Sequence, residues 1–150
     1  MPDNIVCCVI ASQQKDKVWV GMQSKGFLLF NIVEKKITDS VNKSKWQYGQ
    51  INKMTDLKDE LFIATEQNGV IGYNKINGSF TTRILKDSLF PKRIAAMQTD
   101  NEGNIWLATE NKLVSFTGDY LRYWYGSNKI PFIKVHTLLA DDEDRLWFTP

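Results

Sequence analysis

The amino-acid sequence predicts an all-β protein of the β-propeller class, with about three and a half four-stranded blades of a larger ring. An aromatic anchor recurs at spacings of 43, 44 and 41 residues, at Trp19, Phe62, Trp106 and Trp147. Apolar residues flank each anchor on both sides, as expected for a strand that is buried on both faces. Four short strands in about 40–45 residues is the size of one propeller blade.

Each repeat is expected to contain four strands in the same order. The first strand leads into a tight turn, and the residue three positions before the anchor lies in that turn. Gly enters the left-handed backbone region freely, and Asp tolerates it better than most residues. These turn residues are Asp16, Asp59, Gly103 and Asp144. The anchor lies in the second strand, an apolar third strand follows, and a more variable fourth strand completes the repeat.

The residue six positions before the anchor is expected to cap the same turn with its side chain. Asp56, Asp100 and Asp141 can do so, whereas Gln13 takes the place of the carboxylate in the first repeat. Together the repeats form one partial propeller over residues 1–150. The predicted blades, three complete and one half, span residues 5–45, 49–88, 92–129 and 133–150.

Composition and charge exclude several classes of protein. The chain is 43% hydrophobic and 24% charged, which is a globular balance. Its net charge of +2 is spread along the sequence without basic blocks, so no nucleic-acid partner is expected. No apolar run approaches the ~20 residues that cross a bilayer, and no signal peptide is evident. Cys7 and Cys8 are adjacent, and neighbours in a strand point to opposite faces, so we expect no disulfide between them.

Residues that could carry catalysis or hold a metal are few, and we expect no catalytic residue, no cofactor and no metal. His136 is the only histidine, and no nucleophile motif accompanies it. The acidic stretches at 100–104 and 141–144 lack the glycine and glutamate positions of an EF-hand loop. We interpret both as solvated turns.

Ligand-binding residues are expected in the loops at one end of the blades, because propellers usually bind ligands over their central channel. Flat aromatic faces can stack on a ring of a ligand, and charged or planar groups can form hydrogen bonds with its polar groups. The loop residues with these properties are Trp46, Tyr48, Glu66, Gln67, Lys92, Arg93 and Asn111. The aromatic stretch RYWYG at 122–126 is a second candidate for stacking, although packing of an outer strand explains it better.

The repeated pattern resembles the two-component regulator propeller repeat. Its best copy is TDNEGNIWLATENKLVSF at 99–116, and the similarity covers essentially the whole chain. The copies depart from the family pattern where Phe62 replaces Trp, Lys112 replaces Gly and Gln13 replaces Asp, and Asp replaces Gly at three of the turns.

This resemblance implies a non-enzymatic sensor. Similar proteins carry such propellers as the extracytoplasmic, commonly periplasmic, part of membrane-bound hybrid histidine kinases, and many respond to oligosaccharides. The implied partners are an oligosaccharide and the remaining blades and signalling modules of a parent protein, of which this chain looks like a fragment. A protein-interaction scaffold and a propeller lyase stay open as alternatives, and the solitary His136 argues against the lyase. Unpaired blade edges also predict self-association.

Overall fold

The computed structural model describes residues 5–42, 44–84, 94–109, 112–117, 120–124 and 135–149. Strands and turns make up these residues, with no helix among them. Within this part of the chain, nothing forms a helix long and apolar enough to cross a membrane. The chain divides into two compact units, Met1–Leu85 and Lys86–Pro150.

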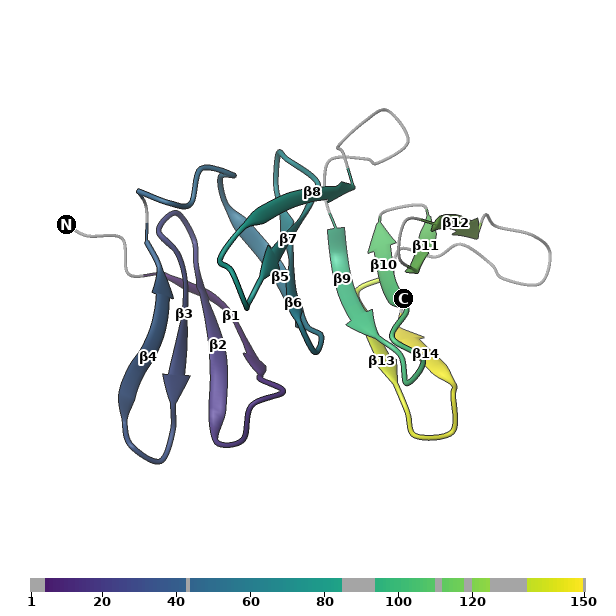
Figure 1. The fold of residues 1–150 in the computed structure, drawn as a ribbon. Coiled ribbons are helices and arrows are strands. Elements are labelled where there is room, and N and C mark those ends of the chain that lie inside the picture. The colour runs from purple at the N-terminus through teal and green to yellow at the C-terminus, as the bar shows by residue number, and fades with distance from the viewer. Residues whose placement is uncertain are drawn as a thin grey trace. The chain divides into compact units, whose positions relative to one another are not determined.

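The first unit contains two four-stranded antiparallel sheets, each ordered as in the sequence (Figure 1). The first sheet consists of β1 (Val6–Ala11), β2 (Lys17–Met22), β3 (Gly26–Asn31) and β4 (Lys36–Val41). The second sheet consists of β5 (Ile51–Asp56), β6 (Glu60–Thr65), β7 (Val70–Asn74) and β8 (Phe80–Ile84). Strand β5 contacts β1 and β2, so the two sheets share one core.

The second unit contains one four-stranded sheet and one two-stranded sheet, both antiparallel. The larger sheet consists of β9 (Ile94–Thr99), β10 (Ile105–Thr109), β11 (Leu113–Thr117) and β12 (Tyr120–Trp124). The smaller sheet consists of β13 (Thr137–Ala140) and β14 (Leu146–Thr149), and β13 contacts β9 and β10. The predicted fold class is confirmed: the chain is an all-β partial propeller built from one repeated antiparallel sheet.

Aromatic rings fill the core between the two sheets of the first unit. Trp19 and Phe27 are almost completely buried, and their rings meet edge to face with centroids 5.8 Å apart. Tyr73 of the second sheet contacts both rings, at 6.5 Å and 5.1 Å. Such pairs each contribute about 0.5–1.5 kcal/mol beyond the burial of their area. The first anchor is therefore held by the next sheet as much as by its own.

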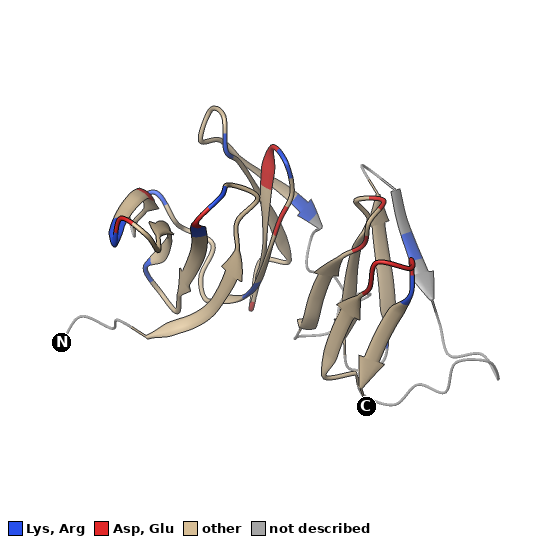
Figure 2. Cartoon of the chain, turned by 90° about the horizontal axis from the view of Figure 1, so that it is seen from below, with Lys and Arg blue, Asp and Glu red and all other residues tan. Residues whose placement is uncertain are grey.

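Many of the charged residues lie at turns and strand ends, as the blue and red segments of the cartoon in Figure 2 show for the described residues. Three of the four predicted turn residues have a left-handed backbone, since φ is 60° at Asp16, 83° at Gly103 and 58° at Asp144. Asp59 also lies in its hairpin turn, as predicted, but it is not among the residues with positive φ. The second repeat closes a tighter hairpin there, in which Leu57 N–H donates to the Glu60 carbonyl at 2.9 Å.

A β-bulge recurs at one place in the first strand of all three four-stranded sheets. The unpaired residues are Cys7 in β1, Asn52 in β5 and Ala95 in β9. In each sheet the bulge lies opposite the second and third residues after the anchor. A bulge locally breaks the alternation of side chains between the two faces of a sheet.

The bulge corrects one expectation about the cysteines. Cys7 and Cys8 do not point away from each other, because Cys7 is the extra residue, and their Sγ atoms are 3.8 Å apart. Both are free thiols.

Candidate functional site

Three loops of the first unit meet at one end of its sheets, and we call them the loop cluster. They are residues 23–25 between β2 and β3, 42–50 between β4 and β5, and 66–69 between β6 and β7. The Asn68 side chain donates to the Tyr48 carbonyl at 2.7 Å, and Glu66 N–H donates to the Gln50 carbonyl at 3.0 Å. The Gln23 amide donates to the Gln50 side chain at 3.3 Å. Hydrogen bonds therefore tie the three loops together.

A threonine at the end of β6 shapes the loop at 66–69. The Thr65 hydroxyl donates to the Gly69 carbonyl at 2.9 Å and accepts from Asn68 N–H at 2.9 Å. The third repeat uses the same device, since Thr109 exchanges both bonds with Lys112 at 3.1 Å. The loop tip is thus fixed by its own backbone and presents its outer side chains to solvent.

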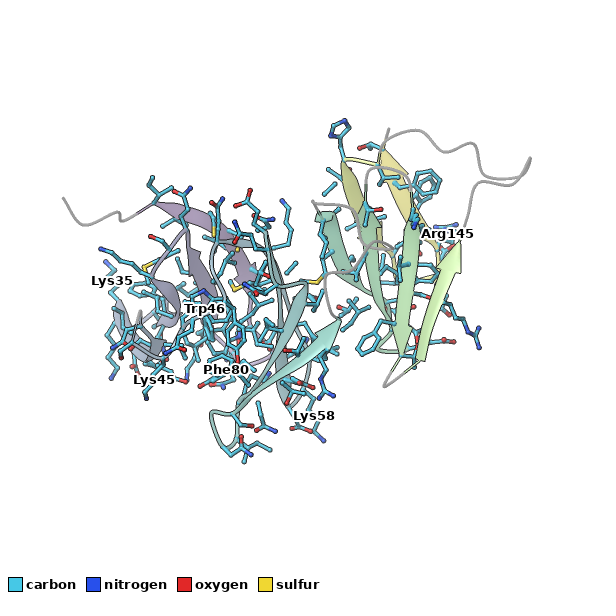
Figure 3. The ribbon with its side chains drawn as sticks, turned by 90° about the horizontal axis from the view of Figure 1, so that it is seen from above. Lys35, Lys45, Trp46, Lys58, Phe80 and Arg145 are labelled. Atoms are coloured by element: carbon cyan, nitrogen blue, oxygen red, sulfur yellow. The ribbon has the colours of Figure 1, made fainter. Side chains whose placement is uncertain are left out.

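The structure places the predicted ligand-binding residues at different depths. Trp46 is only 4% exposed, and its indole N–H donates to the Gly49 carbonyl at 2.7 Å. Figure 3 shows Trp46 beside Phe80, whose ring centroid is 5.9 Å away. Tyr48 is half-buried and lies over both rings, with centroids 5.2 Å from Trp46 and 5.5 Å from Phe80.

Glu66 and Gln67 are exposed at the tip of the loop at 66–69. The structure therefore brings Tyr48, Glu66 and Gln67 to the loop cluster, with Trp46 underneath. Lys92, Arg93 and Asn111 lie outside the described residues.

Asp56 is a buried carboxylate that joins the first two blades. Its Oδ2 accepts from the Trp19 indole N–H at 3.0 Å, from Gln13 N–H at 2.8 Å and from the Ser12 hydroxyl at 3.1 Å. Its Oδ1 pairs with Lys75 Nζ at 2.6 Å, and Lys75 also donates to the Leu57 carbonyl. The predicted turn cap is wrong for Asp56, which reaches across to the previous blade instead.

The equivalent carboxylates of the second unit do cap their own turns, as predicted. Asp100 accepts from the backbone N–H of Glu102 and Asn104 and from the Trp106 indole at 2.7 Å. Burial raises the pKa of Asp100, but hydrogen bonds from Trp106 and Asn104 outweigh it, so the pKa lies below its usual value. Asp141 accepts in the same way from Trp147 and Arg145, which hold its pKa well below the usual range.

A cavity of about 500 Å³ lies in the second unit, where the sequence predicted only strands, turns and an anchor. Its lining includes Trp106, Ser115 and Arg122, which pair across three adjacent strands, and the carboxylates Asp100 and Asp144. Both carboxylates are already engaged, Asp100 by its own turn and Asp144 by the Asn101 amide at 3.2 Å.

The residues at the same positions of the first sheet indicate what this cavity is. Trp19 pairs with Leu29 there as Trp106 pairs with Ser115, and Tyr73 of the next sheet covers these residues. The cavity therefore corresponds to a surface that faces a neighbouring blade, and we do not assign a ligand to it.

Little else in the described part of the chain offers reactive chemistry. His136 is exposed directly before β13, and its backbone N–H donates to the Thr149 carbonyl at 2.9 Å. Among the described residues, no three His, Cys, Asp or Glu side chains gather in a way that could hold a metal ion.

The comparisons with known proteins agree with the repeat. The family described as two component regulator propeller matches residues 88–111. A search of curated proteins found no match.

Among solved structures, two extracellular domains from B. thetaiotaomicron, both described as parts of hybrid two component systems, match 99% of this chain. Their identities are 20% and 19%, with TM-scores of 0.68 and 0.73. The chain spans about a fifth of these domains, 20% and 19% of their lengths.

The WD40 β-propeller domain of Doa1 matches 95% of this chain at 10% identity with a TM-score of 0.71, and the match covers 47% of that chain. These likenesses establish the propeller fold. Residues 88–111 are therefore similar to the two component regulator propeller repeat that the sequence predicted, and they lie within a partial β-propeller.

Proposed function

We propose that this chain is the ligand-binding part of an extracytoplasmic sensor in a two-component regulatory system. It recognises an oligosaccharide and passes the signal to a histidine kinase, without carrying out catalysis itself. The observation that carries the proposal is the family match at residues 88–111. The likeness to extracellular domains of hybrid two component systems supports it.

The loop cluster is the proposed binding surface. Tyr48 offers an aromatic face, while the Glu66 carboxylate and the Gln67 amide offer hydrogen-bonding groups for hydroxyls. Trp46 acts from beneath by holding the Tyr48 ring. Lys92, Arg93 and Asn111, which lie outside the described residues, remain proposed ligand-binding residues on the sequence argument alone.

Signalling follows from the hydrogen bonds between the loops. A ligand that contacts both the 42–50 loop and the 66–69 loop favours those arrangements of the first two blades in which both loops fit it. It shifts their population only as far as its affinity for the two arrangements differs. The remaining blades and the kinase modules of a parent protein would receive this change.

Calorimetric titration against a panel of oligosaccharides tests the proposal. Glu66→Gln should weaken binding about tenfold or more, because a hydrogen bond to a charged group contributes about 1.5–3 kcal/mol. Tyr48→Ala should weaken binding by up to about tenfold, because an aromatic contact contributes about 0.5–1.5 kcal/mol beyond the area it buries. Glu34→Gln is the matched control, since Glu34 is exposed in the turn between β3 and β4 at the opposite end of the first sheet. Failure to bind any glycan, or equal loss in Glu34→Gln, would contradict the proposal.

The same experiment separates the two alternatives. A scaffold would bind a protein partner and ignore glycans, whereas a lyase would convert the glycan, which chromatography of the titrated sample would reveal.

We further propose that the chain associates with itself through its exposed apolar strand. Trp147 and Phe148 of β14 are 56% and 45% exposed, and Leu139 of β13 is 60% exposed. Exposed strand edges with apolar side chains favour pairing with another chain. Light scattering after size exclusion should show dimers or larger species, and a monodisperse monomer would exclude them.

A further inference from the structure

We propose that Cys7, Cys8 and Met54 form a binding site for a soft monovalent cation, Cu(I), in the core between the first two blades. This site is separate from the loop cluster and goes beyond the sensor role. It also departs from the expectation, drawn from the sequence, that the chain holds no metal.

The recurrent bulge creates the site. Because Cys7 is the extra residue of β1, both cysteine side chains lie on the same side of the strand, with their Sγ atoms 3.8 Å apart. In the two other sheets the bulge residues are Asn52 and Ala95, so only the first repeat places sulfur there among the described sheets.

Gly21 leaves room for this arrangement. A Cβ atom on Gly21 would lie 2.7 Å from Cys8 Sγ and 3.3 Å from Cys7 Sγ. It would also lie 3.2 Å from the terminal methyl carbon of Met54, which is bonded to the thioether sulfur. Three sulfur-containing side chains therefore converge over the bare Cα of one glycine, and the same three residues share one hydrophobic cluster.

The distance between the sulfurs favours chelation over a disulfide. Two thiolates bound at ~2.3 Å to one ion lie about 3.8 Å apart in a tetrahedral arrangement and about 4.0 Å apart in a trigonal one. In a disulfide the two sulfurs are ~2.0 Å apart, and the two Cα atoms are usually about 4.4–6.8 Å apart. Consecutive Cα atoms across a trans peptide, as between Cys7 and Cys8, are only ~3.8 Å apart. One ion can thus bridge the pair with little movement.

The donor set selects the ion. Thiolate and thioether ligands prefer Cu(I), whereas Zn²⁺ accepts imidazole and carboxylate as readily. Among the described residues, no His, Asp or Glu side chain lies close enough to the two thiols to form a metal-binding group of three with them. Both cysteines are partly exposed, so the ion can reach them.

Binding involves no change of oxidation state. Two S–H bonds break, two Cu–S bonds form, two protons pass to the buffer, and copper remains Cu(I). The Met54 sulfur adds a lone pair as the third donor.

The test is a titration of the full chain with Cu(I) under anaerobic conditions, in competition with a chromophoric Cu(I) chelator. We expect one ion per chain. Cys8→Ser should weaken binding at least ~100-fold, and Met54→Leu should weaken it about tenfold, by analogy with losses of 10–100-fold when metal sites lose supporting groups. Absence of binding, or full binding by Cys8→Ser, would overturn the proposal.

A second variant covers the case in which Cys8→Ser fails to fold. Gly21→Ala keeps all three sulfurs but pushes a methyl group between them, so it should weaken Cu(I) binding at least ~10-fold while leaving two titratable thiols. Far-UV circular dichroism checks the fold of each variant. Unchanged binding by a folded Gly21→Ala protein, or tighter binding of Zn²⁺ than of Cu(I) by the wild type, would contradict the assignment.

Discussion

Trp19 and Trp106 occupy the same position in their repeats, yet their indole N–H groups find different acceptors. Trp19 donates to Asp56 of the following blade, whereas Trp106 donates to Asp100 of its own turn. The cause is the register between the first two strands of each sheet. The anchor Phe62 pairs with Thr55, seven positions earlier, whereas Trp106 pairs with Gln98, eight positions earlier. This shift of one residue turns Asp56 to the face of its sheet opposite to its anchor, while Asp100 lies on the same face as its anchor.

Two departures from the repeat pattern therefore complement each other. Gln13 leaves Trp19 without a carboxylate from its own turn, and Phe62 leaves Asp56 without an indole in its own blade. The two unmatched partners bind each other between the blades at 3.0 Å. A repeat that lacks a family residue can thus keep the hydrogen bond between indole and carboxylate by using a residue of the neighbouring repeat.

Asp56→Ala should give the largest effect. It removes the partner of Lys75, whose side chain is only 9% exposed, and leaves a buried charge uncompensated. We expect the free energy of unfolding in urea to fall by about 3–5 kcal/mol. The control Asp100→Ala removes the carboxylate of a self-contained turn and should cost about 1 kcal/mol. If both variants lost the same free energy of unfolding, the hydrogen bonds that Asp56 makes between the blades would add no stability.

The pair Trp19→Phe and Trp106→Phe should give the next largest difference. Both changes remove an indole N–H, but Asp56 is buried and Asp100 is partly exposed to water. Trp19→Phe should destabilise the protein by about 1–3 kcal/mol and Trp106→Phe by less than about 1 kcal/mol. Thermal unfolding followed by circular dichroism measures both, and the reverse order would refute the assigned roles.

Gln13→Asp restores the family residue but should not stabilise this protein. The new carboxylate would lie next to Asp56, which already accepts from the backbone of residue 13 at 2.8 Å. Because residue 13 is exposed, water screens most of the repulsion, which should cost about 1 kcal/mol at neutral pH. A double-mutant cycle with Asp56→Asn should abolish that cost. A cost that persists in the double mutant would rule out charge repulsion.

The smallest expected effect is on pH dependence in the third blade. The folded-state pKa of Asp100 lies below its unfolded value. Its contribution is therefore fully present above the unfolded pKa, ~3.9, and is lost as pH falls through the folded pKa. Asp100→Asn should lower the free energy of unfolding by less than about 1 kcal/mol near pH 7. That difference should shrink at pH 3, whereas a difference independent of pH would show that ionisation is irrelevant.

The architecture could be predicted because its signals are local and repeated. Anchors such as Trp19 and turn residues such as Gly103 report burial and backbone conformation directly, and several copies in one register reinforce each other. The strand order of each blade followed from them.

The site could be predicted only in part, because the missing information is tertiary. Trp46 has the chemistry of a stacking residue, but Phe27 and Phe80 bury it, and nothing near Trp46 in the sequence indicates that contact. The role of Asp56 depends on a register shift that leaves its spacing from the anchor unchanged. The closeness of Cys7 and Cys8 depends on a bulge that alternation of apolar residues does not reveal.

The recurring bulge also makes the repeat a practical scaffold for protein engineering. Cys7, Asn52 and Ala95 occupy the same architectural position although their side chains have nothing in common. The backbone at this position accepts a thiol, an amide or a methyl group, so the bulge tolerates different side chains. Labels, cross-linkers or probes could therefore be attached at the same position of the bulge in each of the three four-stranded sheets.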